Sequence, residues 1–313
     1  MPDPAYIDAV VALGQEHGFR VRAHEPMCDH TSFRVGGPAD VLADPSAPEH
    51  VRLLKSFALQ AKVPFALLGA GTNVLVRDGG IRGIVCRLGP AMGHIEVDHV
   101  SHRMSVQAGA LLRQVSLRAA ESGISGMEWA VGIPGNVGGA VFMNAGAHGG
   151  TMADVVVSVT TLTCQCEFRT WQASELAFGY RESALQGTGD IVLEATLQLE
   201  PGSREAIERR HQEILESRRQ AQPLDLPSAG SVFKRPPGDY AGRLIEAAGL
   251  KGRARVGGAV VSEKHAGFIV NTGGATAADV LALIELVQRT VRERMGVELE
   301  PEVRVMGDDP APL

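Results

Sequence analysis

Clustered glycines are the feature that most restricts how this chain can fold. The chain holds 37 glycines among 313 residues, and they gather in short strings. The densest string, GIPGNVGGAVFMNAGAHGG, covers residues 132–150 and contains seven of them. Glycine is favoured where the backbone takes a positive φ or where another group approaches the main chain closely. The clusters therefore predict a ligand laid along the main chain, with a glycine-rich loop between strands as the alternative.

Length and charge limit the class of protein. Domains usually hold roughly 100–200 residues, so 313 residues predict two or three of them. The net charge of −6 is too mild to steer the chain to nucleic acid, and no basic run marks a membrane surface. No Lys or Arg precedes Arg20, and no apolar run approaches the roughly 20 residues of a membrane span. We therefore expect a cytoplasmic protein without nucleic-acid or membrane partners.

Hydrophobic periodicity predicts a mixture of helices and strands without strict βαβ repetition. Helices are expected over 5–17, from 46 to about 61, and over 110–123, 203–219, 240–248 and 277–295. Strands are expected within 32–44 as strand, turn and strand, then within 81–108, 154–199, 256–270 and 297–305. Ser203 is a candidate N-cap, and Thr276 with Asp279 has the spacing of a capping box.

Cysteines and histidines carry no metal or redox signature, and no metal is expected. Cys164 and Cys166 are separated by one residue, whereas redox and zinc pairs have two between them. Alternation along VVVSVTTLTCQCEF places both cysteines on one face of a predicted strand. His148 and His265 show no metal-ligand spacing with each other or with the cysteines.

The string GAGTNVLV at residues 69–76 invites a dinucleotide-binding interpretation but does not support one. Gly69 and Gly71 fit the GxGxxG fingerprint, whereas its third glycine is Val74 here. Gly69, Gly71, Thr72 and Asn73 still offer main-chain N–H donors to a pyrophosphate. A tight turn without a ligand is the alternative.

Three polar residues are weak candidates when each is considered alone. Arg181 lies in FGYRES, Ser231 in PSAGSVFKRPPG and Glu302 in LEPEVRVMG. A lone arginine is usually a surface group, and a glutamate on a polar strand face is usually solvated. No Gly-x-Ser-x-Gly elbow surrounds Ser231, so a turn serine is the ordinary interpretation.

The strings are more specific as an ordered set than singly. TSFRVGGPAD, LGAGTNVLVRDGG, GIPGNVGGAVFMNAGA, FGYRES, PSAGSVFKRPPG, AGRLIEAAGLKG, VSEKHAGFIVN and LEPEVRVMG follow one another over residues 31–307. The chain closely resembles the UDP-N-acetylenolpyruvoylglucosamine reductase (UDP-N-acetylmuramate dehydrogenase) family. The segment between Arg181 and Glu194 is short, so the resemblance is to the subtype that lacks an extra substrate-covering loop with its tyrosine.

This resemblance implies an α+β fold. It consists of an FAD-binding unit of the vanillyl-alcohol-oxidase (PCMH) type and a C-terminal substrate-binding domain. The implied division is an N-terminal helical segment at 1–29, the FAD-binding unit at 30–201 with two subdomains split near 80, a connector helix at 202–222 and the substrate-binding domain at 223–313. The protein is expected to be a monomer with non-covalent FAD.

The resemblance also assigns binding residues. FAD is expected at Val35, Gly36, Gly69, Gly71, Thr72, Asn73, Val74, Leu75, Gly132, Ile133, Pro134, Gly138, Gly139, Asn144, Ala145 and Gly146. The UDP-sugar substrate is expected at Tyr180, Arg219, Lys234 and His265, of which the last three are candidates to replace the missing tyrosine at the diphosphate. Many members of the family have an Asn at the position of Arg235, and some have a lysine at the position of Gln222.

The implied reaction reduces an enolpyruvyl ether to a lactyl ether. NADPH delivers hydride to the flavin and leaves, and the flavin N5 passes hydride to the enol-ether C3. By resemblance Ser231 protonates C2, while Arg181 and Glu302 hold the carboxylate and stabilise the enolate-like intermediate. A positioned, desolvated serine can act as a general acid, and an arginine fork matches a planar carboxylate. We hypothesise that Glu302 acts in its protonated, donating form.

Two other functions are alternatives. A flavin oxidase of the same fold would use oxygen and would lack the joint set of Ser231, Arg181 and Glu302. A non-catalytic protein that binds a UDP-sugar or flavin would show binding without turnover. The presence of all three residues in their strings argues against both.

Overall fold

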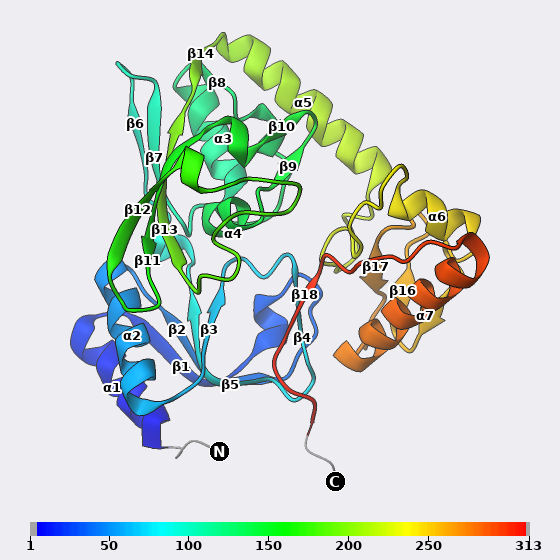
Figure 1. Ribbon diagram of the computed structural model, residues 1–313, viewed down its shortest axis with the longest axis horizontal. Helices are drawn as coiled ribbons and strands as arrows, with labels where there is room; N and C mark the ends of the chain where they lie inside the picture. The colour runs from blue at the N-terminus through cyan, green and yellow to red at the C-terminus, as the bar shows by residue number, and fades with distance from the viewer. Residues whose placement is uncertain (1–4, 311–313) are drawn as a thin grey trace. The chain divides into compact units, whose positions relative to one another are not determined.

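The computed structural model describes residues 5–310, with helices and strands in mixed order (Figure 1). The chain divides into two compact units, each built from separate stretches of sequence. Unit 1 comprises residues up to Arg22, Leu42–Ala70 and Ile84–Arg218, and unit 2 comprises Ala23–Val41, Gly71–Gly83 and the residues from Arg219 onward. No helix among the described residues is long and apolar enough to cross a membrane.

Unit 1 contains a five-stranded antiparallel sheet. Its order is β12 (Phe168–Gln172), β11 (Val156–Leu162), β13 (Ile191–Gln198), β7 (Arg103–Gln107) and β6 (Ile95–Asp98). Burial alternates along residues 193–198 of β13, as expected for a sheet with one face on the core, and the two residues before them are also buried. The short helix α4 (Val137–Phe142) packs against β13, which brings the glycine-rich segment onto this sheet.

Helix α5 (Arg204–Ala221) buries three side chains, and one of them, His211, bonds to α3 (Leu112–Glu121) within unit 1. Ile207, His211 and Ile214 fall on one face of α5 at helical spacing and are its buried residues. His211 Nε2 lies 2.9 Å from Ser116 Oγ of α3, and Ser116 Oγ donates to the Met127 carbonyl at 2.7 Å. Because Ser116 donates its single hydroxyl hydrogen to the Met127 carbonyl, its oxygen can only accept from His211. His211 therefore carries a hydrogen on Nε2 and donates it to Ser116.

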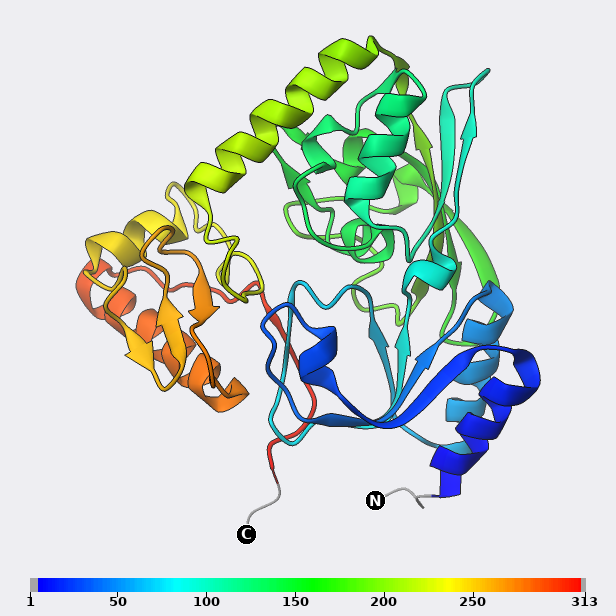
Figure 2. The ribbon, with the colours of Figure 1, turned by 180° about the vertical axis from the view of Figure 1, so that it is seen from behind.

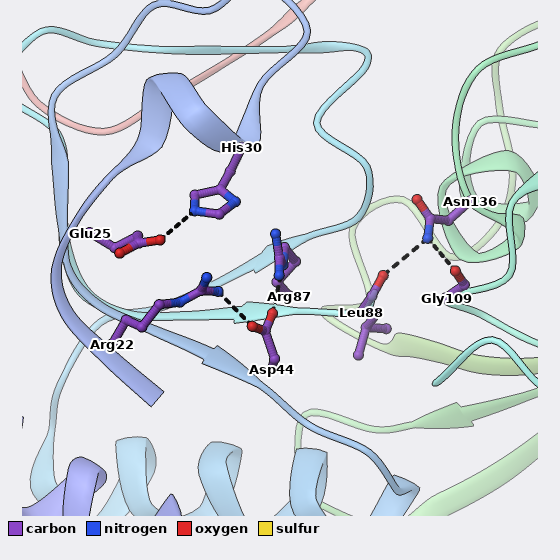
Figure 3. A network of polar contacts seen from close by, with 8 residues as sticks. All are labelled: Arg22, Glu25, His30, Asp44, Arg87, Leu88, Gly109 and Asn136. Carbon is purple, nitrogen blue, oxygen red and sulfur yellow. Dashed lines mark hydrogen bonds and ion pairs between the residues drawn. The ribbon is translucent and has the colours of Figure 1, made fainter. Parts of the chain in front are cut away.

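A four-stranded sheet has the order β1 (Arg20–Pro26), β2 (Pro38–Asp44), β5 (Ile81–Arg87) and β3 (Phe65–Leu68). In each of β1, β2 and β5, some residues belong to unit 1 and the others to unit 2. Asp44 accepts hydrogen bonds from Arg22 at 2.5 Å and from Arg87 at 2.6 Å (Figure 3). Helix α1 (Ala5–His17) packs against α2 (Pro48–Ala61). Unit 1 also holds two two-stranded pairs among its described residues, β9 (Gly146–Ala147) with β10 (Gly150–Thr151), and β8 (Ile124–Ser125) with β14 (Glu200–Pro201).

Unit 2 contains a small antiparallel sheet with helices packed on it. The sheet order is β15 (Arg255–Val256), β16 (Ala259–Val261) and β17 (Ile269–Asn271). Helix α7 (Ala277–Met295) packs against β15 and β16, and α6 (Ala241–Ala247) packs against α7 (Figure 1). The buried stripe of α7 contains the apolar residues predicted for it, Val280, Leu283, Ile284, Val287 and Val291.

Residues from early in the chain complete the core of unit 2. Phe33, Val35 and Leu75 belong to the same buried cluster as the α7 stripe. Strand β18 (Arg304–Met306) pairs in parallel with β4 (Val74–Val76), and both views show the two segments side by side (Figures 1 and 2). Asp78 accepts from the backbone N–H groups of Ala277 and Ala278 at the start of α7. Unit 2 is therefore discontinuous in sequence.

The predicted helices are confirmed, while three strand predictions are wrong in part. Residues 32–37 form turns after a 3₁₀ helix, Met27–His30, and only β2 of the expected pair exists. Cys164 and Cys166 lie in the turn between β11 and β12, where Cys166 has a φ of 65°. The C-terminal strand covers only β18, and Val305 is 42% exposed because β18 pairs with β4 alone.

Candidate active site

Within unit 2 the backbone places Ser231 beside Glu302. Ser231 forms an isolated antiparallel bridge with Phe268, and Val232 N donates to the Gly267 carbonyl at 2.9 Å. On the other side Glu302 N donates to the Val232 carbonyl at 2.7 Å. The serine therefore begins a short segment that is held by backbone bonds to two separate parts of the chain.

Ser231 is exposed at the start of this segment, whereas the two residues that follow it are buried. Val232 and Phe233 are 0% and 3% exposed, whereas Ser231 is exposed and Glu302 is half-buried. Asn73 Nδ2 donates to the Glu302 carbonyl at 3.2 Å, which fixes the backbone that carries the glutamate. This side-chain bond gives Asn73, predicted at the cofactor, a structural role in unit 2.

The basic residues predicted at the diphosphate also lie in unit 2. Lys234 Nζ is 2.5 Å from Glu300 Oε1, so its charge already has a partner. His265 Nδ1 accepts from Gly267 N at 3.1 Å, which leaves Nε2 as the remaining ring nitrogen. Burial lowers the pKa of His265 below its ordinary value, so the ring favours its neutral form. Arg219 is exposed, and its carbonyl accepts from Lys264 Nζ at 2.5 Å.

Arg181 lies in unit 1, in a tight turn with unusual backbone geometry. Gly179 and Glu182 exchange backbone hydrogen bonds of 3.0 and 3.3 Å around the central residues Tyr180 and Arg181. Arg181 has a φ of 59°, in the left-handed region that costs a non-glycine residue about 1–2 kcal/mol. Tyr180 is 55% exposed, and its ring centroid is 5.2 Å from the Arg181 guanidinium carbon.

The turn that carries Arg181 is fastened to the glycine-rich segment. Asn144 Nδ2 donates to the Gly179 carbonyl at 2.9 Å. Gln186 Nε2 donates to the carbonyls of Arg181 and Phe142, both at 2.9 Å, and Phe142 is the last residue of α4. The structure thus brings together two strings that are over 30 residues apart in the sequence. Sequence reasoning missed Gln186, because no motif or periodicity distinguishes it.

Several predicted cofactor residues have an additional explanation in the packing of unit 2. Val35 and Leu75 are 3% and 0% exposed. Gly36 has a φ of 121°, and a β-carbon there would lie 2.7 Å from the Val76 β-carbon. A β-carbon at Gly71 would collide with the His30 carbonyl oxygen. These two glycines are therefore required by the protein's own backbone, whatever ligand they contact.

The remaining predicted cofactor residues lie in unit 1. They are Gly69, Gly132, Ile133, Pro134, Gly138, Gly139, Asn144, Ala145 and Gly146, whereas Thr72 and Val74 accompany Gly71 in unit 2. Gly138 packs closely, since a β-carbon there would lie 2.9 Å from the Ala108 β-carbon. Gly139 instead faces open space, since a β-carbon placed there would have no neighbouring atom of residues 5–310 within 4 Å.

Asn136, at the start of α4, has a buried acceptor atom that no group in the described part of the chain satisfies. The residue is 5% exposed, and its Oδ1 has no hydrogen-bond partner. A β-carbon at Gly69 would lie 3.5 Å from this oxygen, so the two glycine-rich strings meet here within unit 1. An unsatisfied buried acceptor beside open main chain fits a bound cofactor with hydrogen-bond donors, as FAD has.

The chain is similar to known proteins over most of its length. Residues 222–306 match the family model described as UDP-N-acetylenolpyruvoylglucosamine reductase, C-terminal domain, and residues 39–170 match an FAD binding domain. The UDP-N-acetylenolpyruvoylglucosamine reductase of Caldanaerobacter subterraneus subsp. tengcongensis is 48% identical over 285 residues, which cover 91% of this chain and 93% of that protein. The reductase of Clostridium perfringens strain 13 is 45% identical and covers 97% of this chain and 99% of its own length.

A solved structure is similar over nearly the same span. The crystal structure of UDP-N-acetylenolpyruvylglucosamine reductase from Thermus caldophilus has 40% sequence identity with this chain and a TM-score of 0.79. The match covers 92% of this chain and 100% of that one. The likeness therefore extends through both matched domains.

Proposed function

Because the chain belongs to the UDP-N-acetylenolpyruvoylglucosamine reductase family, we propose that it reduces the enolpyruvyl ether of UDP-N-acetylglucosamine to UDP-N-acetylmuramate in peptidoglycan precursor synthesis. The cofactor is FAD and the hydride donor is NADPH. When bound, FAD supplies the substrate with the hydride that it has taken from NADPH. The family relationship and the FAD-binding domain match support the function and the fold class predicted from the sequence.

One observation supports the chemistry most directly, namely the pairing of the Ser231 segment with the Glu302 segment in unit 2. The 2.7 Å bond between Glu302 N and the Val232 carbonyl holds the two residues at a fixed backbone spacing. A hydroxyl and a carboxyl group on neighbouring segments can act on one reacting atom of a substrate, provided that both are rigid.

We assign the proton transfer to Ser231. A serine hydroxyl is a weak acid in water, but positioned against a developing carbanion it can act as the general acid. Ser231 is exposed, while the backbone of Val232 beside it is held by hydrogen bonds to Gly267 and Glu302. The proton on Ser231 Oγ would go to C2 of the enol ether.

Arg181 and Glu302 would act on the substrate carboxylate. The guanidinium has a fixed fork of donors that matches a planar carboxylate and stabilises negative charge as it develops. Glu302, if it holds a proton, would donate to the same charge instead of repelling it. The substrate diphosphate is assigned to Arg219, Lys234 and His265, with Tyr180 beside Arg181. We also propose that the protein acts in the cytoplasm as a monomer.

An anaerobic half-reaction experiment tests the proposal. The flavin spectrum is recorded, NADPH is added, and UDP-N-acetylglucosamine enolpyruvate follows in the absence of oxygen. Wild-type protein should lose the oxidised flavin absorbance and then recover it when the substrate is added. Ser231→Ala should still lose it but recover at least about a hundredfold more slowly, since general acid catalysis typically contributes 10²–10⁴-fold.

The control variant is Ser101→Ala, whose hydroxyl donates to Asp98 in a surface turn. It should show both half-reactions at wild-type rates. Recovery that requires oxygen would favour the flavin oxidase, and binding of flavin or UDP-sugar without reduction would favour a non-catalytic protein. A Ser231→Ala variant that recovers at the wild-type rate would exclude the serine as the proton donor.

A further inference from the structure

Asn136 joins three segments of unit 1 through its side-chain amide. Its Nδ2 donates to the Leu88 carbonyl at 3.1 Å, just after β5, and to the Gly109 carbonyl at 2.5 Å, just after β7 (Figure 3). The backbone reinforces the connection, since Leu111 and Asn136 form an isolated antiparallel bridge. The residue therefore holds the beginning of the glycine-rich helix α4 against two other segments.

These two bonds also determine which way the amide faces. A flipped amide would place Oδ1 against two carbonyl oxygens, and neither of them can donate a hydrogen bond. Nδ2 must therefore face Leu88 and Gly109, and Oδ1 must face away from them, as Figure 3 shows. The orientation of the oxygen thus rests on the chemistry of its surroundings.

Oδ1 is a buried acceptor that residues 5–310 leave unsatisfied. Asn136 is 5% exposed, and no donor among these described residues reaches this atom. Such atoms are rare in native proteins, and each requires an explanation, of which a bound molecule outside the chain is one. The neighbouring Gly69 has no side chain, and the three atoms nearest to a β-carbon at that position would all belong to Asn136.

We propose that Asn136 Oδ1 accepts a hydrogen bond from a ribityl or ribose hydroxyl of FAD. An acceptor requires a donor, and the pyrophosphate, which the main-chain N–H groups around Gly69 are predicted to bind, has none. The donors nearest to the pyrophosphate along FAD are the hydroxyl groups of the sugar units on either side, and the N–H groups of the flavin and adenine rings lie farther along the molecule. Asn136 and Gly69 both fall within residues 39–170, which match an FAD binding domain. Asn136 is thus a cofactor-positioning residue, whose Nδ2 bonds the Leu88 and Gly109 carbonyls while its Oδ1 bonds the cofactor. The inference rests on the proposed FAD-dependent function.

The test measures FAD affinity and needs no catalytic turnover. Apoprotein is titrated with FAD and with FAD analogues that each lack one ribityl or ribose hydroxyl, and binding is followed by flavin fluorescence. For wild-type protein one analogue should bind about tenfold more weakly than FAD, the effect of losing one hydrogen bond to a buried acceptor. In Asn136→Ala that difference should vanish, because the acceptor is absent. The analogue that shows the effect identifies the hydroxyl.

A second variant distinguishes the loss of the hydrogen bond to FAD from a general loss of stability. Asn136→Asp loses the donor atom but keeps an acceptor oxygen, so it should still discriminate against the same analogue even though the apoprotein melts at a lower temperature. The matched control is Asn271→Ala, because Asn271 is also buried but bonds protein groups through both Nδ2 and Oδ1. It should lower the melting temperature and leave the tenfold difference in place.

The possible failures can be told apart. If FAD binds wild-type protein but the analogue differences are the same in Asn136→Ala, the oxygen has no FAD partner and the inference is wrong. A bound water molecule at Oδ1 would give this result. If the wild-type protein does not bind FAD at all, both the inference and the proposed function fail.

Discussion

Arg181 combines a proposed catalytic role with a backbone conformation that suits glycine better. It is the second central residue of the Gly179–Glu182 turn, and its φ is 59°. In turns with a positive φ only at this position, glycine or asparagine is the usual residue. Residues in sparsely populated backbone regions cluster at functional sites, where the strain is tolerated because the side chain is needed. The geometry of Arg181 is consistent with that explanation.

This strain predicts an unusual order of stabilities. Arg181→Gly and Arg181→Ala both remove the guanidinium, but only glycine relieves the strain at positive φ. Urea unfolding should therefore find Arg181→Gly more stable than Arg181→Ala by about 1 kcal/mol. Both variants should lose most reductase activity. At an unstrained position glycine is less stable than alanine, so the reverse order would show that the wild-type residue carries no strain.

Sequence strings were sufficient to nominate Ser231, Arg181 and Glu302 but not the residues that support them. The three lie in long motifs that can be read without a fold. Gln186 and Asn136 act through carbonyl groups that lie close only after folding, so no spacing in the sequence signals them. The glycine clusters were predicted to contact a ligand. Gly36 and Gly71, however, are required by contacts within the protein itself.

At the scale of elements, α5 depends on a histidine that is held neutral. Burial lowers the pKa of His211 from 6.5, although Glu128 and Glu208 oppose the shift. The unfolded chain therefore binds a proton near pH 6.5 that the folded chain resists. The contribution of neutral His211 to stability is complete above pH 6.5 and is lost as the pH falls toward the lower pKa of His211 in the folded state.

The prediction is a difference in pH dependence between two proteins. Wild-type stability to urea should fall between pH 7.5 and pH 5.5, and His211→Gln should lose less over the same interval. Gln keeps an N–H donor for Ser116 but has no proton to gain. His148 and His265 also have lowered pKa values, but they titrate in both proteins and cancel in the comparison. Equal slopes would mean that α5 is insensitive to this protonation.

Helices were predictable because their signals are local, whereas the failed strands depended on distant partners. Thr276 and Asp279 form the capping box that their spacing predicts, and α7 covers the predicted residues 277–295. Residues 32–37 alternate like a strand, but Phe33 and Val35 instead contribute to the core of unit 2. Only tertiary packing reveals that use of an apolar pair.

At the scale of the whole molecule, the C-terminal stretch is not a complete folding unit. The predicted boundary at 223 stays a prediction, but the compact unit also takes in Ala23–Val41 and Gly71–Gly83. Phe33, Val35 and Leu75 lie in its core, and burying each such side chain is worth about 1.5–3 kcal/mol. Domain stabilities are only about 5–15 kcal/mol, so these three contributions are decisive.

A fragment of residues 219–313 should therefore fail to unfold cooperatively. The fragment lacks β4 as partner of β18 and lacks Asp78 at the start of α7. Near-UV circular dichroism of the fragment should show little fixed packing, and mixing it with a fragment of residues 1–218 should restore the signal. A sharp, cooperative melting transition of the isolated C-terminal fragment would contradict this expectation.

The parallel pairing of β18 with β4 has a consequence for biosynthesis. Residues 23–41 leave the ribosome early, but the strand that completes their unit is made at Arg304–Met306, almost at the end of the chain. At roughly 5–20 residues per second, translation of the intervening sequence takes on the order of tens of seconds. Phe33 and Val35 must wait through that interval without their final neighbours, so the nascent chain offers chaperones an apolar segment until synthesis is nearly complete.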